Sequence, residues 1–353
     1  MMSFRNNRLR DLQLPMSSVW LSNDIAEAKG RHELYVRQAP QILKVLRETA
    51  LIQSVESSNR IEGVTVSPER LRPLVLGNTK PRDRSEQEIQ GYRRALAQIH
   101  ATPEKLEITP RLLLEFHALI QGDSGDAGQW KRVDNEIVEL RPGAAPVVRF
   151  RPTPAAHTPT AISELCTAYE RTIAERGLPS LLTIAALVLD FLCIHPFRDG
   201  NGRVSRLLSL LALYQQGHFV GRYVSLERLV EQDREGYYES LGTSSQGWHE
   251  GVHDLLPWLN YFLSVLHRAY RDFETRAGEV KSPRGAKTAL VESAIDQRGA
   301  EFSLADILRA CPGVSQDMIR RVLRTLQRNG AVRCLGRGPG ARWRKAGNTL
   351  KRG

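Results

Sequence analysis

The sequence has few cysteines and no long apolar run. Its four cysteines are scattered over 353 residues, with no close pair to bind zinc or form a redox motif. No segment reaches the roughly 18 apolar residues that a membrane-spanning helix needs, and the Arg- and Asn-rich residues 1–12 lack the apolar stretch of a secretory signal. These absences argue against a secreted, zinc-binding or membrane protein. We expect a reduced, cytoplasmic protein.

Positive charge is in excess, and most of the excess lies at one end. The chain has 50 lysines and arginines against 39 acidic residues, a formal net charge of +11. Residues 277–353 hold 16 of the basic and 6 of the acidic residues, which leaves a net charge of only +1 for the rest of the chain. Length and this asymmetry indicate more than one domain. We expect a helical N-terminal region over 1–100, a core over 101–275, a linker over 276–285 and a basic domain over 286–353.

The stretch 195–206, His-Pro-Phe-Arg-Asp-Gly-Asn-Gly-Arg-Val-Ser-Arg, concentrates polar groups of matching chemistry. Apolar helical patterns precede it over 181–194 and follow it to Gly217, so it predicts a tight loop between two core helices. Asp-Gly and Asn-Gly also mark hairpin turns, but strand-like alternation is missing on both sides. A helix start beside glycines attracts phosphate, because its N–H groups are unpaired and a ligand can approach the backbone closely.

The side chains of this loop suit nucleotide phosphate chemistry. Arg203 and Arg206 lie three residues apart on the first helical turn, where two guanidinium forks can hold two phosphoryl groups. Asp199 suits Mg²⁺, because that ion takes a carboxylate together with phosphate oxygens. His195 can serve as a general base near neutral pH. The loop therefore predicts a phosphate site with a metal ligand and a base.

The loop resembles, position for position, the Fic domain motif His-Pro-Phe-x-Asp/Glu-Gly-Asn-Gly-Arg-x-x-Arg. The resemblance implies an all-α fold, a helical bundle with a small β-hairpin flap. It also implies an enzyme that moves AMP from ATP to a Tyr, Ser or Thr hydroxyl of a target protein, with His195 as base and Asp199 holding Mg²⁺. The related Doc proteins carry lysine in place of Gly202 and act as kinases, so this glycine favours AMP transfer. The residues assigned to ATP binding are Arg198, Gly200, Asn201, Gly202, Arg203, Arg206, Tyr237 and Tyr238.

Within that set, the resemblance implies that residues 200–202 form an anion hole. It also implies that Arg203 binds the inner phosphates of ATP and that Arg206 binds the γ-phosphate. It also implies that Phe197 anchors the loop in the core. Tyr237 and Tyr238 resemble a Fic segment near the adenine pocket, although two tyrosines on a helix are also common in a core.

A second motif, Ser58-x-x-x-Glu62-Gly63, ends a predicted helix over about 41–63. Taken alone, it is an ordinary solvated helix end with a glycine stop. Many Fic proteins carry Ser/Thr-x-x-x-Glu-Gly/Asn on an inhibitory helix. The resemblance therefore implies that Glu62 pairs with Arg206 and takes its guanidinium away from the γ-phosphate. Residues 1–40, with few periodic features, predict a strap over the domain surface.

The flap falls on two β-favourable runs, 133–140 and 147–150, around a Pro/Gly turn. Its exposed edge could align a target segment by strand addition. His117 lies in a predicted helix over 111–121, and we interpret it as a packed core residue. Residues 248–273 predict a long closing helix.

The C-terminal pattern resembles a winged helix-turn-helix, with three helices, caps at Ser303 and Ser315, and a hairpin over 331–345. Arginines repeat on one face of the third helix. This pattern predicts DNA binding through 303–345 or, as the alternative, a packing and protein-docking module with a solvated basic face. Two further alternatives concern the whole protein: removal of AMP from a target, with Glu62 positioning water, or a DNA-binding regulator with a nucleotide-sensing site. The sequence leaves open the target and the oligomeric state, with a homodimer among the options.

Overall fold

The computed structural model describes residues 3–38, 40–77, 79–139, 147–279, 286–296, 298, 301–311, 314–336 and 341–346. The chain divides into two compact units, one of residues 1–26 with 45–271 and one of residues 27–44 with 272–353. Within the described ranges, no helix is both long and apolar enough to cross a membrane. The sequence-based boundaries near residues 100, 275 and 285 stay predictions.

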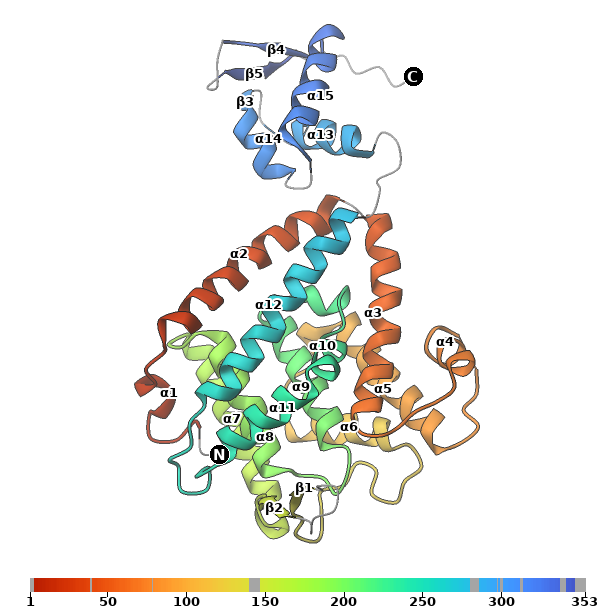
Figure 1. Ribbon diagram of the computed structural model, residues 1–353, viewed down its shortest axis with the longest axis vertical. Helices are drawn as coiled ribbons and strands as arrows, with labels where there is room; N and C mark the ends of the chain where they lie inside the picture. The colour runs from red at the N-terminus through yellow and green to blue at the C-terminus, as the bar shows by residue number, and fades with distance from the viewer. Residues whose placement is uncertain are drawn as a thin grey trace. The chain divides into compact units, whose positions relative to one another are not determined.

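The first unit is a helical bundle around α8 (Ser180–Ile194) and α9 (Asn201–Gln215), the two helices that flank the loop (Figure 1). α8 is buried along almost its whole length, because its sequence is apolar on every face. It packs against α7 (Thr158–Glu175) and α9, while α9 also contacts α5 (Arg84–Ala101) and α6 (Pro110–Gln121). The predicted helical bundle is therefore confirmed. The other helices up to residue 279 are α1 (Arg8–Asp11), α2 (Met16–Gln38), α3 (Pro40–Ile61), α4 (Pro68–Leu76), α10 (Leu226–Gln232), α11 (Arg234–Ser245) and α12 (Leu256–Glu279), with short 3-10 helices at Pro103–Lys105, Ala155–His157 and Phe219–Arg222.

The N-terminal segment, predicted as a strap within a helical region, contains a long helix, α2. Its buried positions are Ser18, Ile25, Ala28 and His32, which recur at helical spacing. Two of these four residues are polar, so the buried face carries little hydrophobic periodicity. The bounds of this helix were therefore not predicted, because helix bounds are inferred from that periodicity.

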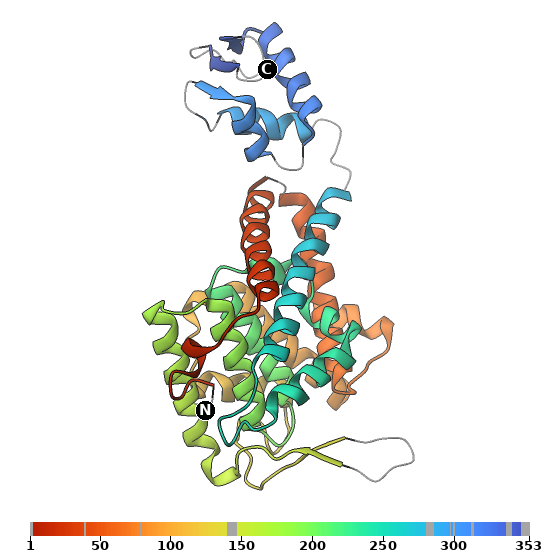
Figure 2. The ribbon, with the colours of Figure 1, turned by 60° about the vertical axis from the view of Figure 1, so that its left-hand side comes forward.

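An antiparallel hairpin of β1 (Ile137–Glu139) and β2 (Val147–Phe150) extends from the helices of the first unit (Figure 2). The predicted flap is therefore present, although residues 140–146 lie outside the described residues. Its first strand begins at Ile137 and not, as predicted, at Val133. In the preceding segment, the side chain of Asp134 accepts the backbone N–H of Ala155 at 2.7 Å, and that of Glu136 accepts a hydrogen bond from Arg151 at 2.9 Å.

The closing helix α12 begins at Leu256, later than the predicted start at Trp248. Residues 246–251 form turns, in which Gly247 and Gly251 have positive φ angles. Trp248 is 3% exposed, and its indole N–H donates to a carboxylate oxygen of Asp190 on α8 at 2.7 Å. A buried tryptophan in a turn mimics the start of an apolar helix, which explains the error.

The C-terminal part of the second unit has the three predicted helices and a small sheet. Ser303 and Ser315 cap helices as predicted, accepting the backbone N–H of Asp306 at 3.2 Å and of Met318 at 3.4 Å. The sheet has the order β3–β5–β4; β3 was missed because its three residues are too few for a periodic pattern. The winged helix-turn-helix assignment stays a prediction. The elements are α13 (Ala286–Asp296), β3 (Glu301–Ser303), α14 (Leu304–Ala310), α15 (Gln316–Arg328), β4 (Val332–Cys334) and β5 (Arg342–Lys345).

Replacing Trp248 by phenylalanine is expected to lower the free energy of unfolding by about 1–3 kcal/mol, because it removes a donor to a fully buried carboxylate. Chemical denaturation measures the loss. Trp20→Phe is the matched control, since that indole is 64% exposed, and we expect a change within about 0.5 kcal/mol. Equal effects of the two substitutions would contradict the role assigned to the contact with Asp190.

Candidate active site

Two left-handed backbone conformations delimit the loop between α8 and α9. His195 ends α8 with a φ of 51°, and Gly200 precedes α9 with a φ of 84°. A positive φ is uncommon for a residue other than glycine and clusters at functional sites. Asn201 closes the loop: its side chain accepts the N–H of Phe197 at 2.9 Å and donates to the carbonyl of that residue at 2.8 Å. That side chain therefore holds the loop, which leaves the backbone N–H of Asn201 at the helix start for an anion.

Stacked rings anchor the loop in the core. Phe197 is fully buried, as predicted, and stacks on His117 with the ring centroids 3.8 Å apart. Nδ1 of His117 accepts the N–H of Gly128 at 3.1 Å, which assigns the proton to Nε2, 3.1 Å from the carbonyl oxygen of Asp199. Burial lowers the pKa of His117 to about 4, so the ring is neutral near pH 7. The prediction of a packed core histidine is confirmed.

Lys131 and Asn135, just before the hairpin, hold the loop from another direction. The backbone N–H of Lys131 donates to the carbonyl of Pro196 at 2.9 Å, and its ammonium group donates to the carbonyl of Ile194 at 3.2 Å and to the side-chain oxygen of Asn135 at 2.8 Å. Asn135 in turn donates to the carbonyl of Phe197 at 3.2 Å. The sequence assigned neither residue a role, because contacts to distant backbone carbonyls leave no local pattern.

His195 is oriented as a base. Its Nδ1 lies 3.3 Å from the carbonyl oxygen of Leu192, so Nδ1 carries the proton and Nε2 offers a lone pair. Burial chiefly, and the nearby charge of Lys131, lower the pKa of His195 to about 4. The imidazole is therefore neutral near pH 7, which is the state that accepts a proton.

Arg203 does not face an open site. Its side chain is 1% exposed, and one terminal nitrogen donates to Glu88 of α5 at 2.5 Å. The other terminal nitrogen lies 3.5 Å from a carboxylate oxygen of Asp199, whose side chain is 61% exposed. Burial alone would raise the pKa of Asp199, but Arg203 and the donors Gln121 and Gly200 outweigh it, and the pKa lies below its ordinary value. The phosphate contact predicted for Arg203 is thus occupied by carboxylates.

Arg206 is held by the end of α3. Its Nε donates to the hydroxyl of Ser58 at 2.8 Å, and one terminal nitrogen donates both to the carbonyl of Ser58 and to Glu62, each at 2.8 Å. Burial alone would lower the pKa of Arg206, but Glu62 raises it above the ordinary value. The other terminal nitrogen is buried with no hydrogen-bond partner among the described residues. The predicted pair of Glu62 and Arg206 is present, and Gly63 follows it with a φ of 82°.

Gly202 allows the carboxylate of Glu62 to lie against the start of α9. A Cβ atom at Gly202 would lie 2.1 Å from a carboxylate oxygen of Glu62 and 3.2 Å from a terminal nitrogen of Arg206. No other residue fits without moving Glu62. The helix start that was predicted to bind phosphate is therefore covered by a carboxylate from α3.

A cavity of about 160 Å³ lies beside the loop. Its lining brings together residues from both sequence motifs and the hairpin. Tyr237 is buried, and burial raises its pKa to about 12, while Tyr238 is 38% exposed. Arg198 points elsewhere: its side chain is 80% exposed and lies 3.4 Å from Asp126. The lining includes Glu62, His195, Gly202, Tyr237 and Tyr238, with Ile137, Arg149 and Phe150 from the hairpin.

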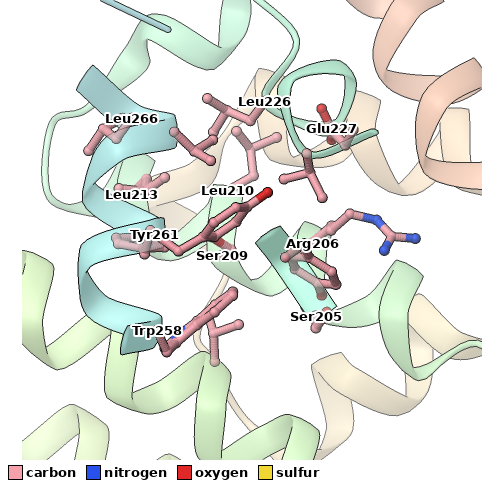
Figure 3. A pocket seen from close by; sticks show the side chains of 15 residues that line it. Ser205, Arg206, Ser209, Leu210, Leu213, Leu226, Glu227, Trp258, Tyr261 and Leu266 are labelled. Carbon is pink, nitrogen blue, oxygen red and sulfur yellow. The ribbon is translucent and has the colours of Figure 1, made fainter. Parts of the chain in front are cut away.

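A second, smaller cavity of about 50 Å³ lies on the other side of Arg206 (Figure 3). Apolar side chains such as Trp258 line most of it. Figure 3 shows the guanidinium of Arg206 pointing away from Trp258 and Tyr261. Glu227, also in the lining, is bound by the hydroxyls of Ser54 and Tyr92. Apolar packing on this side therefore leaves Arg206 facing Ser58 and Glu62.

The loop offers a metal ion the exposed carboxylate of Asp199. In the part of the chain that the structure describes, no three His, Cys, Asp or Glu side chains gather as a preformed metal site. Mg²⁺ usually keeps several waters and is held by one or two carboxylates plus substrate phosphates. A single exposed carboxylate beside a helix start fits that donor set.

Residues 107–213 match the sequence model of the Fic/DOC family. The chain therefore contains a Fic/DOC domain, as the loop motif predicted.

Known proteins resemble this chain in sequence and in structure. The protein named Protein adenylyltransferase Fic of Drosophila erecta is 26% identical over 238 residues, covering 64% of this chain and 42% of that protein. The protein of the same name from Culex quinquefasciatus is 27% identical over 252 residues, covering 68% of this chain and 45% of that protein. The chain thus matches less than half the length of these curated relatives.

Two solved structures share the fold. A Fic family protein from Desulfovibrio desulfuricans G20 has a TM-score of 0.62 and 22% identity, covering 96% of this chain and 99% of that one. A Fic domain containing signaling protein from Bacteroides thetaiotaomicron VPI-5482 has a TM-score of 0.61 and 19% identity, covering 74% of this chain and 99% of that one. These similarities confirm the predicted Fic fold.

Lys131→Met is expected to raise the pKa of His195 above its value of about 4, because removing a nearby positive charge stabilises the imidazolium. Burial remains, so the pKa stays below the ordinary value of about 6.5. An NMR titration of the imidazole signals from about pH 8 down to about pH 3, below the wild-type pKa, measures the shift. Lys105→Met, at an exposed lysine, is the control, and an unchanged titration in Lys131→Met would contradict this electrostatic role.

Proposed function

We propose that this protein is an autoinhibited protein adenylyltransferase, which moves AMP from ATP to a Tyr, Ser or Thr hydroxyl of a target protein. The observation that carries the proposal is one cavity that holds a neutral His195 and the start of α9, with Glu62 lying over that helix start. The names of the curated relatives support the same activity. A cytoplasmic location and a homodimer remain sequence-based predictions.

The transfer needs a base, a site for phosphate charge and a leaving group. The hydroxyl oxygen of the target attacks the α-phosphorus of ATP, and the bond from that phosphorus to the oxygen bridging to the β-phosphate breaks. Pyrophosphate leaves, and Nε2 of His195 takes the hydroxyl proton. Backbone N–H groups at residues 201 and 202 stabilise the charge that develops on the phosphoryl oxygens, while that of Gly200 donates to Asp199 at 2.7 Å. Mg²⁺ held by Asp199 would neutralise phosphate charge when bound.

Inhibition follows from competition for Arg206. Its guanidinium is shared between Ser58 and Glu62, and a γ-phosphate would have to displace the carboxylate. Glu62 also places a negative charge at the helix start, where it repels phosphate. The terminal nitrogen of Arg206 that lacks a partner among the described residues is a buried donor for phosphate once Glu62 leaves.

Glu62→Gly is expected to raise AMP transfer from ATP with a labelled α-phosphate, with Mg²⁺ present, by at least about tenfold, because it frees one charge-assisted hydrogen bond of Arg206. Glu62→Gly/His195→Ala is expected to lose that labelling, because it lacks the base. Labelled protein bands measure self-modification and target modification. Glu56→Gly is the matched control, since Glu56 lies on the same helix and pairs with Arg60 instead.

Absence of labelling in wild type, Glu62→Gly and Glu62→Gly/His195→Ala alike, with ATP still bound, would contradict AMP transfer. The alternative activity, hydrolysis of AMP from a modified target, places Glu62 as the group that positions water. In that case wild type would release AMP from the target and Glu62→Gly would not. Glu62→Gly therefore distinguishes the two activities, because it would raise AMP transfer but abolish AMP release.

A second function is proposed for the C-terminal domain, DNA binding through residues 303–345. The observation that favours it is the exposed basic face of α15. Exposed arginines at helical spacing neutralise phosphates along a groove. The arginines of this face are Arg320, Arg321, Arg324 and Arg328.

Arg321→Ala/Arg324→Ala is expected to weaken binding of the full chain to a DNA duplex and to reduce the slope of log affinity against log salt by about 2, which is about one for each phosphate that is no longer neutralised. Fluorescence anisotropy over a salt series measures both. Arg111→Ala, at an exposed arginine of α6, is the control. A wild-type chain that fails to bind duplex at low salt, or an unchanged slope, would contradict DNA binding by this face.

A further inference from the structure

Glu88 of α5 is a buried carboxylate that contacts the loop through Arg203. It is 4% exposed, and its two oxygens accept hydrogen bonds from two different arginines. One is Arg203, whose terminal nitrogen lies 2.5 Å away, and the other is Arg84 of its own helix, whose Nε lies 2.7 Å away. A buried carboxylate is costly unless it is paired, and Glu88 is paired twice.

These contacts form part of a closed ring that passes through Asp199. The second terminal nitrogen of Arg203 lies 3.5 Å from a carboxylate oxygen of Asp199. The same oxygen accepts from the side-chain nitrogen of Gln121 at 3.3 Å, and the side-chain oxygen of Gln121 accepts from Arg84 at 3.4 Å. Arg84 also donates to Glu88, and this hydrogen bond closes the ring. The ring therefore joins α5, α6 and the start of α9 around one exposed carboxylate.

We infer that Glu88 is a positioning residue, which acts through Arg203 to fix the carboxylate of Asp199 for the metal-bound phosphates of ATP. The inference rests on the proposed AMP transfer. A guanidinium is planar, so a carboxylate on one of its terminal nitrogens sets the direction of the other. Partners behind a metal ligand orient it and tune its affinity for the ion. Arg203 serves here as the link between two carboxylates, because Glu88 and Asp199 lie against its two terminal nitrogens.

The two arginines of the loop motif, Arg203 and Arg206, differ in how their carboxylate partners are buried. Glu62 holds Arg206 at the cavity, with 25% of the carboxylate side chain exposed, and water can replace it when it leaves. Glu88 holds Arg203 from the core side, with 5% of its side chain exposed. If Arg203 moved away toward a phosphate, the buried carboxylate of Glu88 would lose that partner. Glu62 is therefore a competitor of phosphate, and Glu88 is a permanent partner.

Glu88→Gln is the direct test, because it keeps the shape of the side chain and removes its charge. We expect it to weaken ATP binding in the presence of Mg²⁺ by about tenfold or more and to change ATP binding without Mg²⁺ by less than about twofold. Isothermal titration calorimetry of ATP in the Glu62→Gly background measures both affinities. In the same background, kcat of AMP transfer is expected to fall, with the loss partly recovered at higher Mg²⁺.

Glu86→Gln is the matched control. Glu86 lies on the same helix, is 5% exposed and accepts hydrogen bonds from Arg70 at 2.6 and 2.7 Å, but it is not part of the ring. We expect similar destabilisation of the fold and no Mg²⁺-dependent change in ATP binding. Should Glu88→Gln fail to fold, Arg84→Met opens the ring at a 65%-exposed side chain and is expected to give a smaller loss of the same kind.

Three results would overturn the inference and leave the proposed AMP transfer standing. Tighter ATP binding or faster transfer in Glu88→Gln would make Glu88 a second inhibitory carboxylate. Equal weakening with and without Mg²⁺ would make Arg203 a direct phosphate ligand. If Glu62→Gly binds ATP and adding Glu88→Gln leaves that affinity unchanged, Glu88 has no role in ATP binding, while the proposed function stands. If Glu62→Gly itself bound no ATP, the proposed function and this inference would both fail.

Discussion

The ion pair between Glu62 and Arg206 is the contact on which the state of this site depends. It joins the end of α3 to the first turn of α9, and the carboxylate lies so close to the helix that a side chain at position 202 would displace it. The helix start offers N–H groups and positive potential to an anion, and in this structure a side chain of the protein itself supplies the negative charge. Occupation by Glu62 and occupation by phosphate therefore exclude each other.

The rest of the site is built to stay fixed while that contact changes. Asn201 ties the loop to itself, Phe197 and His117 stack in the core, and Lys131 binds the carbonyls of the loop from outside. The ring through Glu88 does the same for the metal-binding carboxylate. A rigid base, a rigid helix start and one exchangeable carboxylate suffice for a switch, because a single ion pair separates the two states.

The sequence predicted those parts of the site that lie close together along the chain. The run 181–194 and the loop 195–206 predicted α8, α9 and the tight loop between them. It could not predict Glu88 or Asn135, because their partners are distant in sequence and neither belongs to a motif. It missed α2 because Ser18 and His32 share that helix's buried face, and it placed the start of α12 too early because the buried Trp248 sits in a turn. Local chemistry could be predicted, whereas long-range polar pairing required the fold.

The most direct test of this account is the affinity of the full chain for ATP with Mg²⁺, measured by calorimetry on wild type and Glu62→Gly. The variant is expected to bind ATP at least about tenfold more tightly, because Arg206 and the helix start no longer have to release a carboxylate. Equal affinities would show that Glu62 does not compete with phosphate and would contradict the account at its centre.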